Sequence, residues 1–137
     1  MSGRMLKIPL AIKILIITIL VSVIASVAVY TAMLADTNSV ISYAESVFRG
    51  EVPLSETAGQ PVDMYNINHY LNGSSDTVEV NLKITRRFVL HDFFDGYIWA
   101  TYTDDSSVGK GDCQIPSRWK IHKTNGQWQI VAIKEKP

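Results

Sequence analysis

The first predicted element is an uninterrupted apolar helix near the N-terminus. Residues 14–35, ILIITILVSVIASVAVYTAMLA, contain no charged residue. As a helix they would extend ~33 Å at ~1.5 Å per residue, enough to cross the ~30 Å hydrocarbon core of a bilayer. Arg4, Lys7 and Lys13 precede this run and Asp36 follows it. The positive-inside rule therefore predicts a single-pass cell-membrane protein with residues 1–13 in the cytoplasm and residues 36–137 outside.

A cleaved signal peptide is the alternative interpretation of the same segment. Ser26, Val27 and Ala28 form a small-x-small motif that a signal peptidase could cut. The apolar run is longer than the about 7–15 residues of a typical signal sequence, and cleavage would leave the apolar stretch VYTAML exposed. We therefore predict an uncleaved signal anchor, with cleavage left open.

Helical spacing continues directly after the apolar run. Five apolar residues after Asp36 fall at i, i+1, i+4, i+7 and i+8 and form one stripe: Val40, Ile41, Ala44, Val47 and Phe48. Gly50 is placed to end this amphipathic helix. Residues 53–61, between two prolines, predict irregular chain, and residues 63–73 predict a weak second helix carrying Met64, Ile67 and Leu71.

From residue 76 the period changes to two. Val78, Val80, Leu82 and Ile84 alternate with polar residues, which predicts a strand with one buried face. The alternation is lost in RRFVLHDFF, as expected if the strand bulges, bends or becomes covered on both sides. Asp95 and Gly96 then predict a tight turn, and residues 97–103 the partner strand.

The last 19 residues, WKIHKTNGQWQIVAIKEKP, predict a β-hairpin with Asn125 and Gly126 at the turn. In that register Lys123 faces Trp128, Ile121 faces Ile130, and Trp119 faces Ala132. Cross-strand neighbours share a face, so this hairpin is predicted to supply half of the core. The predicted core residues are Trp119, Ile121, Trp128, Ile130 and, on the preceding strand, Trp99.

Charge and cysteine content limit the functions open to the outer part. From Asp36 onward there are ten Lys and Arg against thirteen Asp and Glu, a net −3. A nucleic-acid partner is unlikely on this distribution, since phosphate binding requires a clustered basic face. Cys113 is the single cysteine, so no internal disulfide can form. The sequence also shows no nucleophile elbow, metal-ligand spacing or phosphate loop. The segment DDSSVGKGD lacks the order of a calcium loop, and we predict no cofactor and no metal site.

The element order, two helices followed by four antiparallel strands closing on WKIHKTNGQWQIV, resembles the nuclear transport factor two-like superfamily of cystatin-like α+β rolls. The resemblance covers residues 36–137 and departs from the family in its short helical part, where a third helix is missing. It implies a curved sheet wrapped around a helix, with a conical pocket. The expected fold is therefore α+β: a transmembrane helix, then one or two helices packed on a curved four-stranded antiparallel sheet. The combination also resembles small anchored extracytoplasmic proteins of Gram-positive bacteria.

Members of that superfamily that are enzymes use a carboxylate, or a His with a carboxylate, inside the cone. The nearest candidates here are His91, Asp92 and Arg86, which we take as speculative ligand-binding residues. Consecutive strand residues point to opposite faces, so His91 and Asp92 are not expected to converge. We assign no catalytic residue, and a structural role for His91 is favoured.

Three hypotheses remain for the function of the chain. The first, which we favour, is a non-catalytic module held at the membrane that contacts another membrane or envelope protein. The second is a pocket-bearing small-molecule binder or enzyme of the roll fold, which requires His91 to converge with Asp92 or Arg86. The third is a membrane-helix partner that associates through Ser22, Ser26 and neighbouring small residues. A cone filled by aromatic side chains would favour protein partners.

Overall fold

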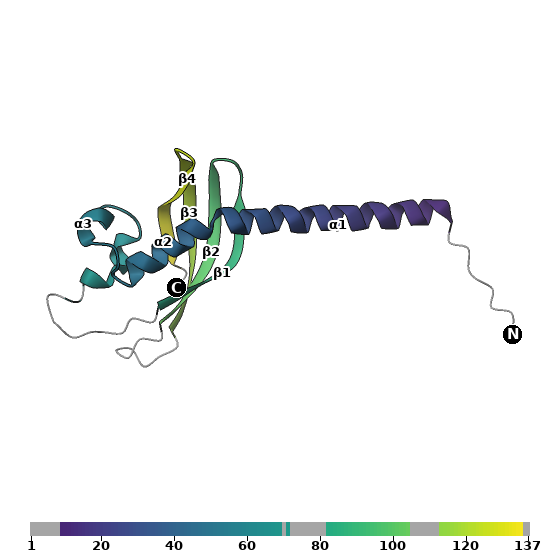
Figure 1. The fold of residues 1–137 in the computed structure, drawn as a ribbon. Helices are drawn as coiled ribbons and strands as arrows, with labels where there is room; N and C mark the ends of the chain where they lie inside the picture. The colour runs from purple at the N-terminus through teal and green to yellow at the C-terminus, as the bar shows by residue number, and fades with distance from the viewer. Residues whose placement is uncertain (1–8, 70, 72–81, 105–112, 136–137) are drawn as a thin grey trace. The chain divides into compact units, whose positions relative to one another are not determined.

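The computed structural model describes residues 9–69, 71, 82–104 and 113–135. The chain divides into two compact units, residues 1–32 and residues 33–137. It combines helices with an antiparallel sheet, so the α+β class predicted from the sequence is confirmed (Figure 1). The predicted strand positions Val78 and Val80 lie outside the described residues, as does most of the DDSSVGKGD segment.

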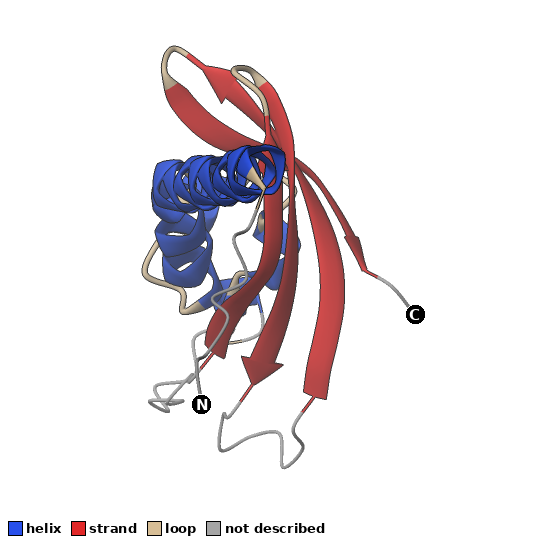
Figure 2. Cartoon of the chain, turned by 90° about the vertical axis from the view of Figure 1, so that its right-hand side faces the viewer, coloured by secondary structure: helices blue, strands red, loops and turns tan. Residues whose placement is uncertain are grey.

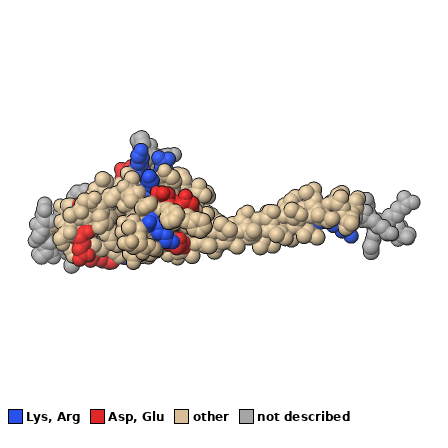
Figure 3. Space-filling view, turned by 90° about the horizontal axis from the view of Figure 1, so that it is seen from above, with Lys and Arg blue, Asp and Glu red and all other residues tan. Residues whose placement is uncertain are grey.

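The first element, α1, comprises Leu10–Asp36, and none of its residues is buried. By length and composition α1 could cross a membrane. Its charged residues, Lys13 and Asp36, lie near its two ends, and the stretch between them carries no charge colour in Figure 3. The hydroxyls of Thr18, Ser22 and Ser26 donate to carbonyls four residues earlier at 2.8–3.0 Å. These polar groups are therefore satisfied within the helix.

The last turn of α1 belongs to the second unit, which begins at Met33. Met33 and Leu34 are partly buried and pack against the core of that unit. The membrane boundary predicted at Asp36 stays a prediction. The packed part of the second unit begins within the last turn of α1.

The second helix, α2, comprises Asn38–Phe48 and follows α1 after Thr37. All five residues of the predicted apolar stripe are buried, so this prediction is confirmed. Arg49 caps the C-terminus of α2, and Gly50 follows at φ +74°, the left-handed conformation that ends many helices.

The segment after α2 differs from the prediction. A short helix, α3, comprises Leu54–Thr57, where irregular chain was expected. The predicted helix over residues 63–73 is wrong in its described part, which contains two 3₁₀ turns, η1 (Asp63–Tyr65) and η2 (Ile67–His69). Buried Asn66 explains the difference, because its amide donates to Val52 O at 2.9 Å and its Oδ1 accepts from Asn68 N at 3.1 Å. Side-chain bonds of this kind compete with helical ones.

The sheet has four antiparallel strands in the order β1-β2-β3-β4, so β1 and β4 are its edges. The strands are β1 (Leu82–His91), β2 (Asp95–Asp104), β3 (Cys113–Thr124) and β4 (Gln127–Glu135). Figure 2 shows the strands bending around the helices, which lie on one face of the sheet. The other face, here called the outer face, has no described element packed on it.

The turn between β1 and β2 is not at Asp95 and Gly96, as the sequence predicted. It lies at residues 92–95, and His91 pairs with Gly96 instead of Ala100. The side chain of Asp92 accepts hydrogen bonds from the backbone amides of Phe94 and Asp95, both at 2.7 Å. These bonds fix the turn at residues 92–95, ahead of the predicted position. Gly96 is needed in the strand, because a Cβ there would lie 2.4 Å from that of His91. The predicted bulge is present between Arg86 and Phe88.

The last hairpin follows the prediction around its turn. Asn125 and Gly126 have φ of 52° and 80°, and Lys123 pairs with Trp128 and Ile121 with Ile130. Trp119 pairs with Ile133 instead of Ala132, because a bulge shifts the register between Lys120 and Ile121. Beyond the bulge the side-chain faces of β4 are exchanged, because the bulge adds one residue to one strand only. Ile133 therefore packs against the core, and Ala132, which the sequence placed on the core face, pairs with the outward-facing Lys120.

The core lies between α2 and the inner face of the sheet. Trp119, Ile121 and Trp128 are buried in it, and Ile130 is partly buried against it. Trp99 does not belong to this core: it lies between the buried residues Ile98 and Ala100, so its ring is on the outer face, 5.4 Å from the ring of Phe88. Four rings fill the space between α2 and the sheet, with centroids 4.9–6.5 Å apart, namely Phe48, Tyr65, Tyr102 and Trp119.

Candidate functional site

The polar side chains of the inner face converge on the junction between α1 and α2, residues 34–38. At its centre, Asp36 Oδ2 accepts from Trp128 Nε1 at 2.7 Å and from Lys123 Nζ at 3.2 Å. The Lys123 ammonium also lies 5.1 Å from the centroid of the Trp128 ring. Two residues of the final hairpin thus bind the last residue of the apolar helix.

The carboxyl group of Asp36 is ionised more readily than usual. The Trp128 hydrogen bond, supported by Lys123 and by the nearby His91, lowers its pKa below the ordinary 3.8, although partial desolvation acts in the opposite direction. The side chain is 43% exposed, so this stabilisation is screened by water.

Arg86 binds the other side of the junction. Its Nη1 donates to Leu34 O at 2.6 Å and to Thr37 Oγ1 at 3.2 Å, and its Nη2 donates to Asn38 Oδ1 at 2.7 Å. The C-terminal carbonyls of a helix lack intrahelical donors. The Arg86 guanidinium supplies a hydrogen-bond donor to one such carbonyl at the end of α1. Arg86 is therefore committed to a structural contact at its guanidinium.

His91 lies on the inner face, with its side chain 10% exposed and its ring centroid 4.7 Å from that of Trp128. Its Nδ1 lies 2.8 Å from Asp92 O and, since a carbonyl only accepts, Nδ1 carries the proton. Nε2 is buried without a hydrogen-bond partner and lies 3.9 Å from Asp36 Oδ2.

Asp92 has a different role from His91 and Arg86. It is exposed at the β1–β2 turn, and the amides of Asp95 and Phe94 lower its pKa by hydrogen bonding to the carboxylate. The three residues singled out from the sequence therefore do not form one ligand pocket. His91 and Arg86 contact the α1–α2 junction from one side of the sheet, and Asp92 stabilises a turn.

Sequence analysis missed Asp36, Lys123 and Trp128 as a polar group. Asp36 was used only as a topology marker, and Trp128 only as a core residue. The available signal was a carboxylate directly after an uncharged run, at a helix C-terminus where the helix dipole disfavours negative charge. Such a residue needs a cationic or N–H partner, which the final hairpin provides.

A separate groove lies between α2 and β4, with a volume of about 510 Å³. Tyr43 and Gln60 border it on the helical side, where the Tyr43 hydroxyl donates to Gln60 Oε1 at 2.9 Å. Gln127 and Gln129 border it on β4. Among the described residues, only uncharged side chains line this groove, and none of Arg86, His91 and Asp92 contributes to it.

Within the described ranges, no group of three or more His, Cys, Asp and Glu residues is arranged to hold a metal ion. Comparisons of the chain with protein families, with curated proteins and with solved structures find no match. The function is therefore argued from the geometry alone.

Proposed function

We propose that this chain is a single-pass membrane protein whose outer α+β domain is a non-catalytic interaction module. The N-terminus lies in the cytoplasm, because Arg4, Lys7 and Lys13 precede the apolar helix. We further propose that the outer domain belongs to the nuclear transport factor two-like rolls. Helices on one face of a bent antiparallel sheet support that membership.

One observation supports an interaction module more than any other. The inner side of the sheet, where an enzyme of this fold would hold its substrate, is filled by the rings of Phe48, Tyr65, Tyr102 and Trp119. Arg86 and His91 face the α1–α2 junction instead of a cavity. A filled interior and committed polar residues favour recognition at the surface.

The groove between α2 and β4 is the surface we assign to this recognition, and an extended, uncharged segment of another membrane or envelope protein is its occupant. β4 is an edge strand, so its outer backbone groups are available for pairing with an added strand. The glutamine amides of Gln127 and Gln129 can bond polar groups of that segment without requiring charge.

Site-specific photocrosslinking in native membranes tests this assignment. A photoreactive residue at Tyr43 or Gln129 should give one discrete protein adduct, and the same residue at Lys83, exposed on the opposite sheet edge, should not. Proteolytic mapping should place the crosslink of both groove positions in the same short segment of the partner. The absence of an adduct from the groove positions, or the same adduct from Lys83, would rule out the groove.

A small-molecule binder is the second candidate, because a volume of about 510 Å³ is within the range of ligand pockets. Native mass spectrometry of the purified full chain distinguishes the two. A small molecule retained by the wild type and lost in Tyr43→Ala would favour the second candidate over the first.

A further inference from the structure

The outer face of the sheet carries the large apolar side chains of Phe88, Leu90, Tyr97 and Trp99, and Phe93 and Phe94 lie at the adjoining β1–β2 turn. These six residues are here called the aromatic face. Phe93 is 85% and Phe94 66% exposed at the β1–β2 turn. The pairing of Phe88 with Trp99 and of Leu90 with Tyr97 joins the two strands across this face.

This pattern is unusual for the open side of an antiparallel sheet. Such a face is normally polar, because water covers it, and monomeric soluble proteins rarely expose large contiguous apolar patches. Phenylalanines that are this exposed at a turn contribute little to the fold itself. The aromatic face therefore requires an occupant.

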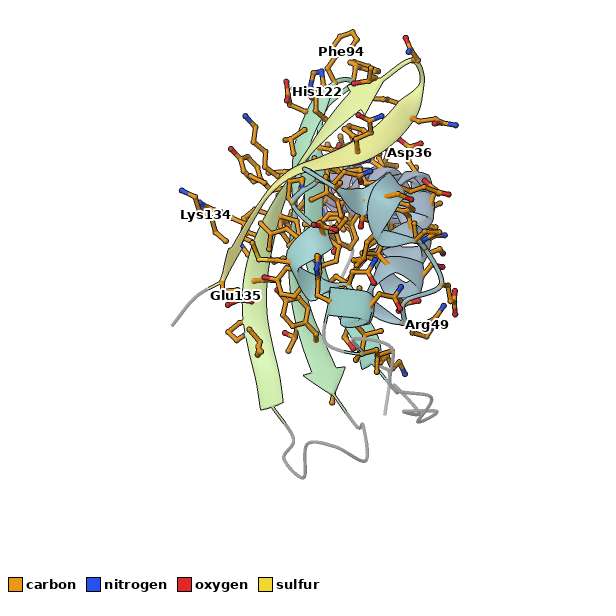
Figure 4. The ribbon with its side chains drawn as sticks, turned by 90° about the vertical axis from the view of Figure 1, so that its left-hand side faces the viewer. Asp36, Arg49, Phe94, His122, Lys134 and Glu135 are labelled. Atoms are coloured by element: carbon orange, nitrogen blue, oxygen red, sulfur yellow. The ribbon has the colours of Figure 1, made fainter. Side chains whose placement is uncertain are left out.

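Cationic side chains border the aromatic face on β3 and β4. The Arg118 guanidinium lies 5.5 Å from the centroid of the Tyr97 ring. Lys120 and Lys134 are exposed on the same side, and Figure 4 shows Lys134 projecting away from the helices. Trp and Tyr beside Lys and Arg are typical of the membrane–water interface, where the rings enter the headgroup region and the cations contact lipid phosphates.

The β1–β2 turn is linked by short contacts to the end of the apolar helix. Phe94 O accepts from Lys123 N at 2.7 Å, and Lys123 Nζ binds Asp36 at 3.2 Å. Figure 4 shows Phe94 at the tip of the sheet, beside His122. The unit that contains this turn begins at Met33, directly after the apolar residues that precede it in α1. The interfacial layer is about 5–7 Å thick on each side.

The turn also contains two carboxylates, which anionic lipid would repel. Asp92 is bound by the turn amides at 2.7 Å, and Asp95 Oδ1 lies 3.0 Å from His122 Nδ1. At a membrane surface the phenylalanines of the turn are therefore suited to contact the apolar part of the headgroup region, and the cations of β3 and β4 are suited to contact anionic headgroups.

We propose that the aromatic face, led by Phe93 and Phe94, inserts into the headgroup layer of the bilayer that α1 crosses, with Arg118, Lys120 and Lys134 bound to anionic lipid headgroups. This inference depends on the anchoring part of the proposed function and is independent of the groove. The domain then lies against the membrane along β1 and β2, which leaves the groove at β4 open to a protein partner.

Tryptophan fluorescence of the full chain in lipid nanodiscs tests this contact. The chain has three tryptophans, of which Trp119 and Trp128 are buried on the inner face. Lipids brominated near the headgroup should quench Trp99, and Trp99→Phe should lose that quenching. Phe93→Ser with Phe94→Ser should reduce it. Replacing anionic by zwitterionic lipid should also reduce it, whereas added inorganic phosphate should not restore it.

Two outcomes would overturn the inference. Quenching of Trp99 by aqueous iodide but not by brominated lipid would show that this face lies in water. Protection from both quenchers would show that protein covers it, such as a second copy of the chain. A separate experiment tests whether α1 spans the bilayer. If it does not, alkaline carbonate should release the chain from membranes. Loss of the groove crosslink would leave the quenching of Trp99 unchanged.

Discussion

Asp36 is the residue on which the α1–α2 junction depends most, because Trp128, Lys123 and His91 all approach its Oδ2 atom. We expect Trp128→Phe to remove the N–H donor and to lower the free energy of unfolding. Part of that loss comes from reduced packing of the ring. A double-mutant cycle with Asp36→Ala, which removes the acceptor, isolates the hydrogen bond, and its coupling energy should be about 1 kcal/mol.

Urea unfolding of the full chain in detergent micelles, followed by far-UV circular dichroism, measures this cycle. Gln129→Ala, a change at an exposed neighbour on β4, is the control and should shift stability little. Strictly additive effects of the two substitutions would contradict a direct bond between Trp128 and Asp36.

The pH dependence of stability gives a second prediction at this residue. Hydrogen bonding to Trp128 lowers the folded-state pKa of Asp36 below 3.8, so the ionised carboxylate stabilises the fold above pH 3.8. That contribution is lost as the pH falls through the lower folded-state value. It amounts to less than about 1 kcal/mol, because a partly exposed pair is screened.

Wild type and Asp36→Asn should therefore differ most near pH 7 and converge below pH 3.8, in unfolding measured across that range. The Asp36→Asn variant is needed for comparison because the pKa of Asp92 is also lowered. Protonation of Asp92 therefore also makes the wild type less stable as the pH falls. Parallel curves for the two proteins would show that Asp36 has no part in the acid response.

Single residues were the least predictable level of this structure. Arg86 and His91 were singled out as speculative ligand-binding residues, but they contact the α1–α2 junction, and their partners there lie far away in the sequence: Leu34 O, for example, is 52 positions from Arg86. Only the tertiary fold brings these groups together. Trp99 was misplaced for a local reason, because strand alternation defines two faces without stating which one is buried.

Elements with strong periodicity were predicted well, and those governed by side-chain hydrogen bonds were not. The apolar stripe of α2 and the Asn125–Gly126 turn depend on local pattern and local conformation alone. The chain around Asn66 and the turn at Asp92 instead depend on single side chains that bond the backbone. An Asp-Gly pair is a valid turn signal, but Asp92 competes with it three residues earlier.

Gly96 tests the corrected register of β1 and β2. A Cβ at this position would lie 2.4 Å from His91 Cβ and 2.9 Å from Leu90 O. Gly96→Ala should therefore force the strands apart and lower the free energy of unfolding by about 1–3 kcal/mol. In the register with a turn at Asp95 and Gly96, His91 would face Ala100, and this clash would not exist.

Gly59→Ala is the matched control in the same urea titration. Gly59 has no atom near its would-be Cβ, so only its φ of +80° penalises alanine, by about 1 kcal/mol. A loss of stability in Gly96→Ala no larger than that in Gly59→Ala would contradict the observed pairing of Gly96 with His91.

For the whole molecule, the sequence predicted the fold class, but it gave no sign that Met33 and Leu34, inside the predicted membrane segment, pack against the core of the unit that begins at Met33. The reason is physical: Met33 and Leu34 are as apolar as the residues before them, although they pack on a protein core. Hydropathy measures the preference for leaving water. It cannot distinguish a side chain that leaves water for lipid from one that leaves it for protein.

This boundary can be tested by a twelve-residue Gly-Ser insertion between Ala32 and Met33. The remaining helix, from Leu10 to Ala32, is still about 35 Å long at ~1.5 Å per residue and can span the bilayer. The domain keeps Met33, Leu34 and the contacts of Asp36, so its unfolding midpoint in urea should not change. The linker allows a separation of about 20 Å, so quenching of Trp99 by brominated lipid should decrease.

The same linker placed after Ser2 is the control, and it should leave both the midpoint and the quenching unchanged. A lower unfolding midpoint in the Ala32–Met33 insertion would show that residues before Met33 stabilise the domain. Unchanged quenching would show that the aromatic face is held at the bilayer by its own affinity, without help from its short connection to the apolar segment. A stable domain with less quenching would show that this short connection keeps the outer domain against the membrane.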